Sequence, residues 1–402
     1  MKRKLAVILL PVFLLAFVTG CWSRNELNEF SIAAGISVDK PGDMYEVAVQ
    51  VLEPKQYASN KKGGGGQSPV ILFKAKGYSI SEALRKMTKT SPRRIHLGHL
   101  RILAIGEKTA REGLNEIIDF FRRNRYFRAD FDIVIAKGTA AENILTVMSP
   151  IDNVPAAKVY QSIETSEDYL SSAAGVKLDA LITTLSSTGK SVVLPGLKVT
   201  GSLKKGNSAD NLKTIEPSSD IELLGLSVFK DDKLIGWLSQ QESLGFNYIT
   251  DNVTHSGLVT DCPSGKQKIS FEVMRSKTKI KGKIQQGVPR VELFVRTEMN
   301  IDEIACHMDL ANPATIDELQ EDASKYLEQF LTNTIKTVRT KYKTDIFGFG
   351  EVLHRADPIA WRELNDNWDK KFADLQVAVK AEVKIRNIGT VIHSMSKVAG
   401  KE

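Results

Sequence analysis

Cysteine and histidine are scarce in this sequence, which has three cysteines and six histidines among its 402 residues. The cysteines, Cys21, Cys262 and Cys306, form no CxxC pair and no Cys/His cluster, so the sequence predicts no zinc site. His96 and His99 are close in sequence, but no acidic or third imidazole ligand lies nearby, and we interpret both as structural. We therefore predict no metal-binding residues.

Recognisable catalytic and nucleotide-binding motifs are also missing. The sequence contains no GxSxG, HExxH, GxGxxG or DxD cluster, and its carboxylates form no recognisable acid/base pair. The glycine run at residues 63–66 lacks the GxxxxGKS/T pattern and is not followed by a helix, so we interpret it as part of a hairpin loop. We predict neither catalytic nor cofactor-binding residues, and a binding or assembly protein rather than an enzyme.

Long hydrophobic runs are missing beyond the start of the chain. The run at residues 5–18 is roughly 14 residues long, short of the ~20 that a membrane-spanning helix needs. It follows the basic residues 2–4, an arrangement typical of a secretory signal. It ends in residues 18–21, Val-Thr-Gly-Cys, which is the lipobox pattern. We therefore predict a lipoprotein signal peptide over residues 1–20 and a diacylglyceryl group on Cys21, the one covalent group that we expect; an ordinary signal with an incidental cysteine is the alternative.

A strong excess of charge of one sign is missing too. The formal charge of +7 falls to +4 once the three basic residues of the signal leave. This mild excess is consistent with a surface near anionic lipid and is too small to indicate nucleic acid. We expect the mature chain to be soluble apart from its acyl anchor. Two thiols in a large exported chain make no disulfide framework, so pairing of Cys262 with Cys306 stays open, and we expect buried or free thiols.

Residues 21–200 predict an N-terminal α/β domain, with division into two subdomains as the alternative. Strands and helices alternate from residue 79 to residue 147, which indicates a βαβ unit and a partly parallel sheet. The expected strands cover residues 30–39, 45–52, 70–77, 99–106, 131–136 and, as an edge strand because of Pro195, 192–200. The expected helices cover residues 81–89, 109–123, 139–147, 166–174 and 176–186. About eight residues separate Cys21 from the first strand and span at most ~26 Å, so the first sheet should lie close to the headgroups.

Residues 220–402 predict a C-terminal α+β domain. The polar stretch 201–220 is the expected boundary, although a long hairpin loop has the same composition. Antiparallel strands are expected around the turns at residues 231–232 and 286–287, and a last strand at residues 375–385. The longest helix is expected near residues 313–342, packed on the chain's own sheet, with a coiled coil to a partner as the alternative. The fold class predicted for the whole chain is mixed α/β or α+β, multi-domain, with a mixed or antiparallel sheet packed with helices in each domain.

Two aromatic patterns have both a structural and a functional interpretation. Four arginines between residues 122 and 128 surround Tyr126 and Phe127, as on some nucleic-acid surfaces. We favour cations that complement the dipole at a helix C-terminus. Trp361 and Trp368 recur with helical spacing and could stack on a sugar, but beside Leu364 and Phe372 we interpret them as core residues.

Several segments together resemble the Ger(x)C family, the C-subunit lipoproteins of spore germinant receptors. The resemblance begins at residues 20–27, GCWSRNEL, where the family usually has Asp in place of Ser23. The other matching segments are IAAGISVDK at residues 32–40, GHLR at 98–101, GLSVFK at 225–230, LIGWL at 234–238, and DIFGFGE at 345–351 leading to the two tryptophans. As a set they span nearly the whole mature chain.

The resemblance implies a lipoprotein on the outer face of the spore inner membrane, assembled with A-type and B-type integral membrane subunits. Such a receptor responds to nutrient germinants, and release of ions and dipicolinate follows. The family offers no catalytic residue to carry over, and Cys21 corresponds to its acylation site. Because germinant binding is usually placed on the membrane subunits, we expect this chain to be an assembly or transducing partner. A solute-binding lipoprotein of a transporter is the alternative, and a cell-wall-acting enzyme ranks last.

Overall fold

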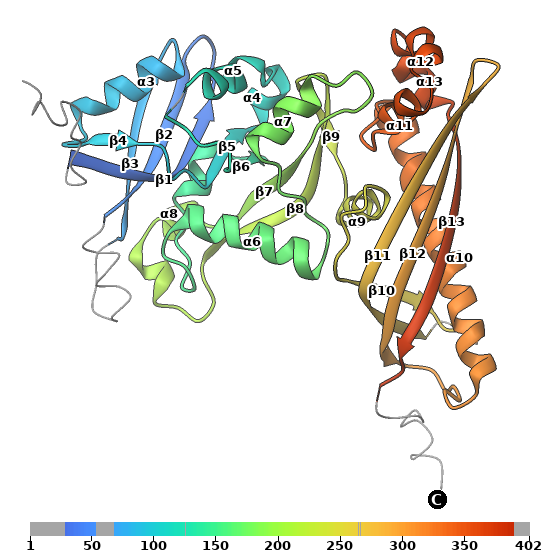
Figure 1. Cartoon of the computed structure of the whole chain (residues 1–402). Coiled ribbons are helices and arrows are strands. Elements are labelled where there is room, and N and C mark those ends of the chain that lie inside the picture. The colour runs from blue at the N-terminus through green and yellow to red at the C-terminus, as the bar shows by residue number, and fades with distance from the viewer. Residues whose placement is uncertain (1–28, 54–67, 125, 264, 266, 390–402) are drawn as a thin grey trace, which may run out of the picture.

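The structure is a computed structural model that describes residues 29–53, 68–124, 126–263, 265 and 267–389. The predicted signal peptide, Cys21 and the glycine run at residues 63–66 lie outside the described residues. The described strands form two sheets, each packed with helices, which occupy the left and right parts of Figure 1. The predicted fold class is confirmed.

The first sheet has parallel strands at its centre and antiparallel strands at both edges. Its order is β3-β2-β1-β5-β6-β7-β8-β9, and β4 pairs with β1 beside this path. Neighbours from β1 through β5 and β6 to β7 are parallel, whereas β2, β3, β8 and β9 pair antiparallel. The strands are β1 (Phe30–Asp39), β2 (Tyr45–Leu52), β3 (Val70–Gly77), β4 (Arg94–His96), β5 (Ile102–Gly106), β6 (Asp132–Ala136), β7 (Val193–Gly201), β8 (Ser219–Lys230) and β9 (Lys233–Trp237).

Helices cover both faces of this sheet because its central strands are apolar on both sides. In β5, Leu103 and Ile105 belong to one hydrophobic core, and Ile102 and Ala104 belong to the core on the other face. α3, α5 and α7 pack on the first core and α6 on the second. The helical segments are α3 (Ile80–Lys86), η2 (Met87–Lys89), α4 (Glu107–Glu112), α5 (Asn115–Arg123), η3 (Ala141–Leu145), α6 (Pro155–Tyr169), α7 (Leu178–Leu185), α8 (Leu203–Gly206) and η4 (Ala209–Leu212).

The second sheet has the order β10-β11-β12-β13 and is also mixed. The first three strands are antiparallel, and β13 closes the sheet parallel to β12. The strands are β10 (Ser256–Asp261), β11 (Lys268–Gln285), β12 (Val288–Ile304) and β13 (Gln376–Asn387). The helical segments are α9 (Gln240–Ile249), α10 (Pro313–Thr337), the π-helical turn η5 (Val338–Tyr342), α11 (Phe349–Ala356), α12 (Pro358–Asn365) and α13 (Trp368–Ala373).

The long helix packs along its own sheet, as predicted, and it also closes a sheet edge. α10 follows β13 along its length (Figure 1), and Leu319, Leu327 and Leu331 on its inner face are buried. Asn312 caps it, and its side chain accepts a hydrogen bond from Ala314 N. Within the described part of the chain, no helix has both the length and the apolar character that crossing a membrane requires.

Several predicted elements are wrong in position or type. The helix expected at residues 109–123 is two helices, because Gly113, at φ 143°, ends α4 and the Leu114 N–H donates to the Asp232 carbonyl. The helix expected at 139–147 is the 3₁₀ segment η3. In place of the helix expected at 166–174, the longer helix α6 begins at Pro155 and ends at Tyr169. β4, before β5, was not predicted at all.

β7 is an interior strand, so the prediction of an edge strand at residues 192–200 is wrong. It lies between β6 and β8, but its pairing with β6 covers only Gly196 and Leu197. Pro195 lies just before that short pairing, and its missing N–H therefore interrupts no ladder there. Residues 201–220 connect β7 to β8, which pair from Gly201 and Ser219 onward, so the first sheet continues across this stretch to Trp237.

Cys262 and Cys306 form a disulfide, so the expectation of free thiols is wrong, although both residues are buried as expected. β10 and β12 are both antiparallel to β11 and therefore end on the same side of the sheet. Each cysteine follows one of these two strands closely, with 6.4 Å between the Cα atoms and a sequence separation of 44. The pairing depends on strand register, which the spacing in the sequence did not show.

Candidate functional site

The two halves of the molecule meet at a contact that we call the joint, formed by residues 187–191 and residues 344–351. The Ser191 N–H donates to the Asp345 carbonyl over 2.7 Å, and the hydroxyls of Ser191 and Thr344 are 2.6 Å apart. Ser187 Oγ donates to Glu351 Oε1 over 2.7 Å. The DIFGFGE segment singled out in the sequence is therefore one of the segments that hold the second half against the first.

Two glycines allow the backbones to touch at the joint. A Cβ atom on Gly189 would lie 2.6 Å from Glu351 N, and one on Gly350 would lie 2.7 Å from Gly189 Cα. Neither position has room for a side chain unless the backbone moves. The halves also share a hydrophobic core, because Leu226 and Val228 of β8 belong to the same cluster as Phe347 and Phe349.

Asp345 organises the joint with its side chain. Its carboxylate is buried and accepts four hydrogen bonds, from the N–H groups of Phe347, Gly348 and Gly350 and from Trp368 Nε1, at 2.8–3.1 Å. Burial raises the pKa of Asp345 to about 6, while these N–H donors oppose the rise. The carboxylate thus fixes the turn at Gly348, where φ is 79°, and the start of α11.

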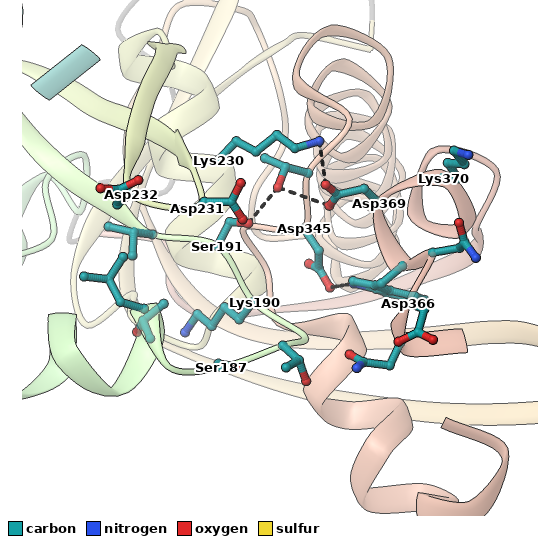
Figure 2. A pocket seen from close by; sticks show the side chains of 18 of the residues that line it. Ser187, Lys190, Ser191, Lys230, Asp231, Asp232, Asp345, Asp366, Asp369 and Lys370 are labelled. Atoms are coloured by element: carbon teal, nitrogen blue, oxygen red, sulfur yellow. Dashed lines mark hydrogen bonds and ion pairs between the residues drawn. The ribbon is translucent and has the colours of Figure 1, made fainter. Parts of the chain in front are cut away.

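A polar cavity of about 520 Å³ opens above the joint, lined from both halves (Figure 2). Lys230, at the end of β8, forms an ion pair of 2.7 Å with Asp369 of α13, and this contact raises the pKa of the lysine. Within the described residues, Lys190 and Lys370 line the same cavity, and their side chains form no hydrogen bond or ion pair. The Lys230–Asp369 ion pair thus connects β8 to α13 across the cavity.

The chemistry that this cavity offers is polar recognition. The described lining contains no imidazole and no thiol, and Asp345 uses both oxygens to hold the backbone. Asp232 is occupied as well, because it accepts from Asn115 N at the start of α5. Ligand pockets for small molecules are usually lined mainly by apolar groups, unlike this one.

A second cavity, of about 710 Å³, lies on the first half and is lined in part by His99 and Arg101 of the GHLR segment noted in the sequence. Close to it, Asp132 is buried and its Oδ1 atom has no hydrogen-bond partner. Burial raises the pKa of Asp132 to about 6; Lys177 opposes this rise, and Glu167 adds to it. Burial likewise raises the pKa of Glu167.

Trp361 and Trp368 lie in the core, as interpreted, whereas His96 is half-buried and His99 is exposed. The rings of His96 and His99 are 5.6 Å apart, and no group of three or more potential ligands exists among the described residues. Trp361 and Trp368 are buried with their rings 5.1 Å apart, so a sugar cannot stack on them. Phe127 packs in an aromatic cluster with Phe120, Phe121 and Phe131, and ion pairs join Arg123 to Asp119 and Arg128 to Asp130.

The joint and its aspartate were not predicted from the sequence. Asp345 is followed by glycines at positions 348 and 350, whose N–H groups reach the carboxylate. An aspartate followed within a few residues by glycines indicates hydrogen bonds from backbone N–H groups to the aspartate side chain. This pattern could have identified Asp345 from the sequence. Cys21, the predicted lipidation site, lies outside the described residues and stays a prediction.

The fold and the joint define a class of protein with two helix-packed mixed sheets locked together through a short glycine-containing segment. Models of two domains match the chain: "Spore germination protein N-terminal domain" at residues 23–199 and "Spore germination B3/GerAC like, C-terminal" at residues 224–389. The chain belongs to this family of spore germination proteins, in agreement with the resemblance in its sequence.

Relatives match over nearly their whole length. Spore germination protein KC of Bacillus subtilis (strain 168) is 31% identical over 395 residues, which cover 97% of each chain. Spore germination protein B3 of the same organism is 23% identical, covering 94% of this chain and 96% of the relative. The crystal structure of the GerBC protein, 20% identical, matches with a TM-score of 0.53 over 91% of this chain and all of that chain, which shows a common fold.

Proposed function

We propose that this chain is the lipid-anchored, non-catalytic subunit of a nutrient germinant receptor needed for spore germination. It assembles with A-type and B-type integral membrane subunits on the outer face of the spore inner membrane, held there by the acyl group on Cys21. The observation that carries the proposal is the match to spore germination proteins in both halves of the chain. The lipobox that ends in Cys21 supports the lipid anchor in this proposal.

The disulfide supports export of the chain. Disulfides persist in oxidising compartments outside the cytosol, and Cys262 and Cys306 form one within a single sheet. This agrees with a signal peptide at the N-terminus. The joint supports a transducing role, because hydrogen bonds, an ion pair and a common core connect the two halves.

The transporter alternative requires two similar lobes around a ligand cleft. Among the described residues the first sheet has nine strands and the second has four, and the cavity between the halves is lined by charged groups, several of them paired. The cell-wall enzyme required accessible tryptophans, and Trp361 and Trp368 are buried. Both observations favour the receptor subunit.

Replacement of Cys21 tests the proposal. Cys21→Ala removes the thiol that carries the acyl group, and we expect the chain to leave the membrane fraction and the spores to lose the nutrient response of this receptor. Ser23→Ala is the matched control, since it alters the same segment and leaves the thiol in place. Unchanged membrane retention and germination in Cys21→Ala spores would contradict the proposal. Tight stoichiometric binding of a nutrient to the purified chain, measured by titration calorimetry, would favour the transporter alternative.

A further inference from the structure

One face of the second sheet is covered by α10 and α11, and its other face is exposed and rich in basic residues. On β11 the exposed positions alternate as Lys277, Lys279, Lys281 and Lys283, while the residues between them face the helices. Gly282, one of those intervening residues, lies against Leu353 of α11, which identifies the covered side. The lysines therefore project together from the uncovered face.

Strand register extends this face across three strands. Lys277 lies opposite Arg296 and Lys283 opposite Arg290, so cations face cations at these two positions of β11 and β12. Lys281 and Arg275 lie opposite Glu292 and Glu298. Phe294 lies opposite Lys279 of β11 and Lys380 of β13, and its side chain is 41% exposed. An exposed aromatic ring thus lies in a row between two lysines. We call this surface the basic face.

The carboxylates on the basic face are already occupied by cations. Glu298 pairs with Arg386 over 2.8 Å, and Glu292 and Glu382 are 3.7 and 4.0 Å from Lys283 and Lys384. Within the described residues, the side chains of six cations of the face form no hydrogen bond or ion pair: Arg275, Lys279, Lys281, Arg290, Arg296 and Lys380. In addition to Arg386, two of them, Arg275 and Arg296, lie close enough to Glu298 to lower its pKa. Like charges directly opposite each other destabilise a sheet. An anionic surface docked here would remove that cost.

We propose that the basic face docks on the anionic phospholipid headgroups of the membrane that carries the anchor. The proposal thus rests on the proposed function for the presence of that membrane. A sheet face with a net positive charge complements an anionic membrane surface, and Phe294 adds an exposed apolar group to this face. Sheets that bind single-stranded RNA use two or three stacking aromatics, whereas this face has one exposed ring, which favours lipid over nucleic acid.

The position of the basic face gives it a separate role from the anchor. The predicted anchor precedes β1, in the sheet at the left of Figure 1, and β11–β13 form the right end of the molecule. Attachment through both the anchor and the basic face would hold the long axis of the molecule parallel to the membrane. The acyl group keeps the chain at the membrane, and the basic face sets its orientation.

Vesicle binding by the mature chain carrying Cys21→Ser tests the basic face without the acyl group. The probes are vesicles of phosphatidylcholine alone and of phosphatidylcholine mixed with phosphatidylglycerol, with binding measured by co-sedimentation at increasing salt. We expect binding to the anionic vesicles that declines as salt rises, and none to the neutral ones. Lys281→Gln should weaken binding about fivefold, because a basic side chain at such a surface contributes ~1 kcal/mol.

The charge-reversed triple variant Lys279→Glu, Lys281→Glu, Lys380→Glu should bind at least a hundredfold more weakly. A triple variant at exposed lysines of the first half, Lys108→Glu, Lys204→Glu, Lys205→Glu, carries the same change in net charge and should keep most of the binding. Thermal unfolding of both confirms that they fold. Phe294→Ala should weaken binding while leaving the salt dependence unchanged.

Equal binding to neutral and anionic vesicles, or equal loss in the two triple variants, would overturn the proposal. Binding to single-stranded nucleic acid with none to anionic vesicles at the same salt would also overturn it. These outcomes are independent of the anchor, which the Cys21→Ala spores test separately. A chain can therefore fail this test and remain a lipid-anchored receptor subunit.

Discussion

Two buried aspartates differ in their surroundings, although burial raises the pKa of each to about 6. Asp345 accepts four hydrogen bonds, and all four come from N–H groups that cannot themselves accept. Asp132 has one oxygen without any partner and two acidic neighbours, Glu164 and Glu167. Replacement by asparagine, which is neutral and has the same shape, should therefore have opposite effects at the two positions.

At Asp345, asparagine removes the charge and replaces one accepting oxygen with an NH₂ group that faces N–H donors. We expect Asp345→Asn to lower the free energy of unfolding by about 2–4 kcal/mol, because it weakens charge-assisted hydrogen bonds and leaves buried donors unpaired. Urea unfolding measures the change. Asp366→Asn, exposed on the same cavity, is the control and should change stability by less than about 0.5 kcal/mol. An equal effect of both variants would contradict the role given to Asp345.

At Asp132, the raised pKa predicts a pH dependence of stability. The folded chain holds this proton up to a pH of about 6, and the unfolded chain releases it near the ordinary value of 3.8. Between these pH values the folded state binds more protons, so the contribution of this group to stability falls as the pH rises. Asp132→Asn should remove this part of the slope and stabilise the chain at pH 7, by on the order of 2 kcal/mol. Urea unfolding from pH 4 to pH 7 checks this, and an unchanged slope with lower stability at pH 7 would contradict it.

Among the elements, the disulfide between Cys262 and Cys306 ties the ends of β10 and β12 together. It closes a long loop, so its loss should cost about 2–4 kcal/mol. The measurement compares guanidinium unfolding of the native chain, the dithiothreitol-treated chain and the Cys262→Ala, Cys306→Ala variant. We expect the last two to be similarly destabilised, and stability insensitive to dithiothreitol would show that the bond does not form.

β13 is an edge strand, and side chains of α10 accept hydrogen bonds from the N–H groups on its outer edge. Ala381, Val383 and Ile385 donate to Glu328, Ser324 and Gln320 respectively, at 2.9–3.1 Å. Acceptors four residues apart on one helix thus match alternate residues of the strand. This arrangement blocks the edge against pairing with a second chain.

Removal of the three acceptors tests this capping. The variant Gln320→Ala, Ser324→Ala, Glu328→Ala should lose about 1–3 kcal/mol of stability and associate at high concentration, because three edge N–H groups become free. Unfolding curves and light scattering measure both effects. Glu321→Ala with Lys325→Ala breaks an exposed ion pair on the same helix and should change neither. A monomeric triple variant of normal stability would contradict the capping role.

Element by element, the predictions succeeded where local signals sufficed. The Ile- and Val-rich run of β1, the alternation in β2, the turn at Gln286-Gly287 with both φ angles positive, and the Asn312 cap with Pro313 are all local. The failures depend on tertiary context: Gly113 ends a helix where Asp232 from another hairpin receives the next N–H. The disulfide and the joint likewise depend on register and on segments about 160 residues apart, which no single-sequence pattern specifies.

At the scale of the whole molecule, two mixed sheets are held together by the joint and by a core that both supply. The family match covers both sheets, and the structural match to the GerBC protein covers nearly all of the chain. The basic face lies on the second sheet, whereas β1, the first described strand of the chain, belongs to the first sheet. On this account the protein acts by contact with lipid and with membrane subunits.

The mass of the N-terminal peptide of the mature chain tests the central claim of lipid anchoring most directly. Trypsin applied to the membrane fraction should release residues 21–24, which end at Arg24, because cleavage of the signal leaves Cys21 first. The account predicts that this peptide carries a diacylglyceryl group on the Cys21 sulfur. An unmodified Cys21 in a chain free in the surrounding fluid would contradict it.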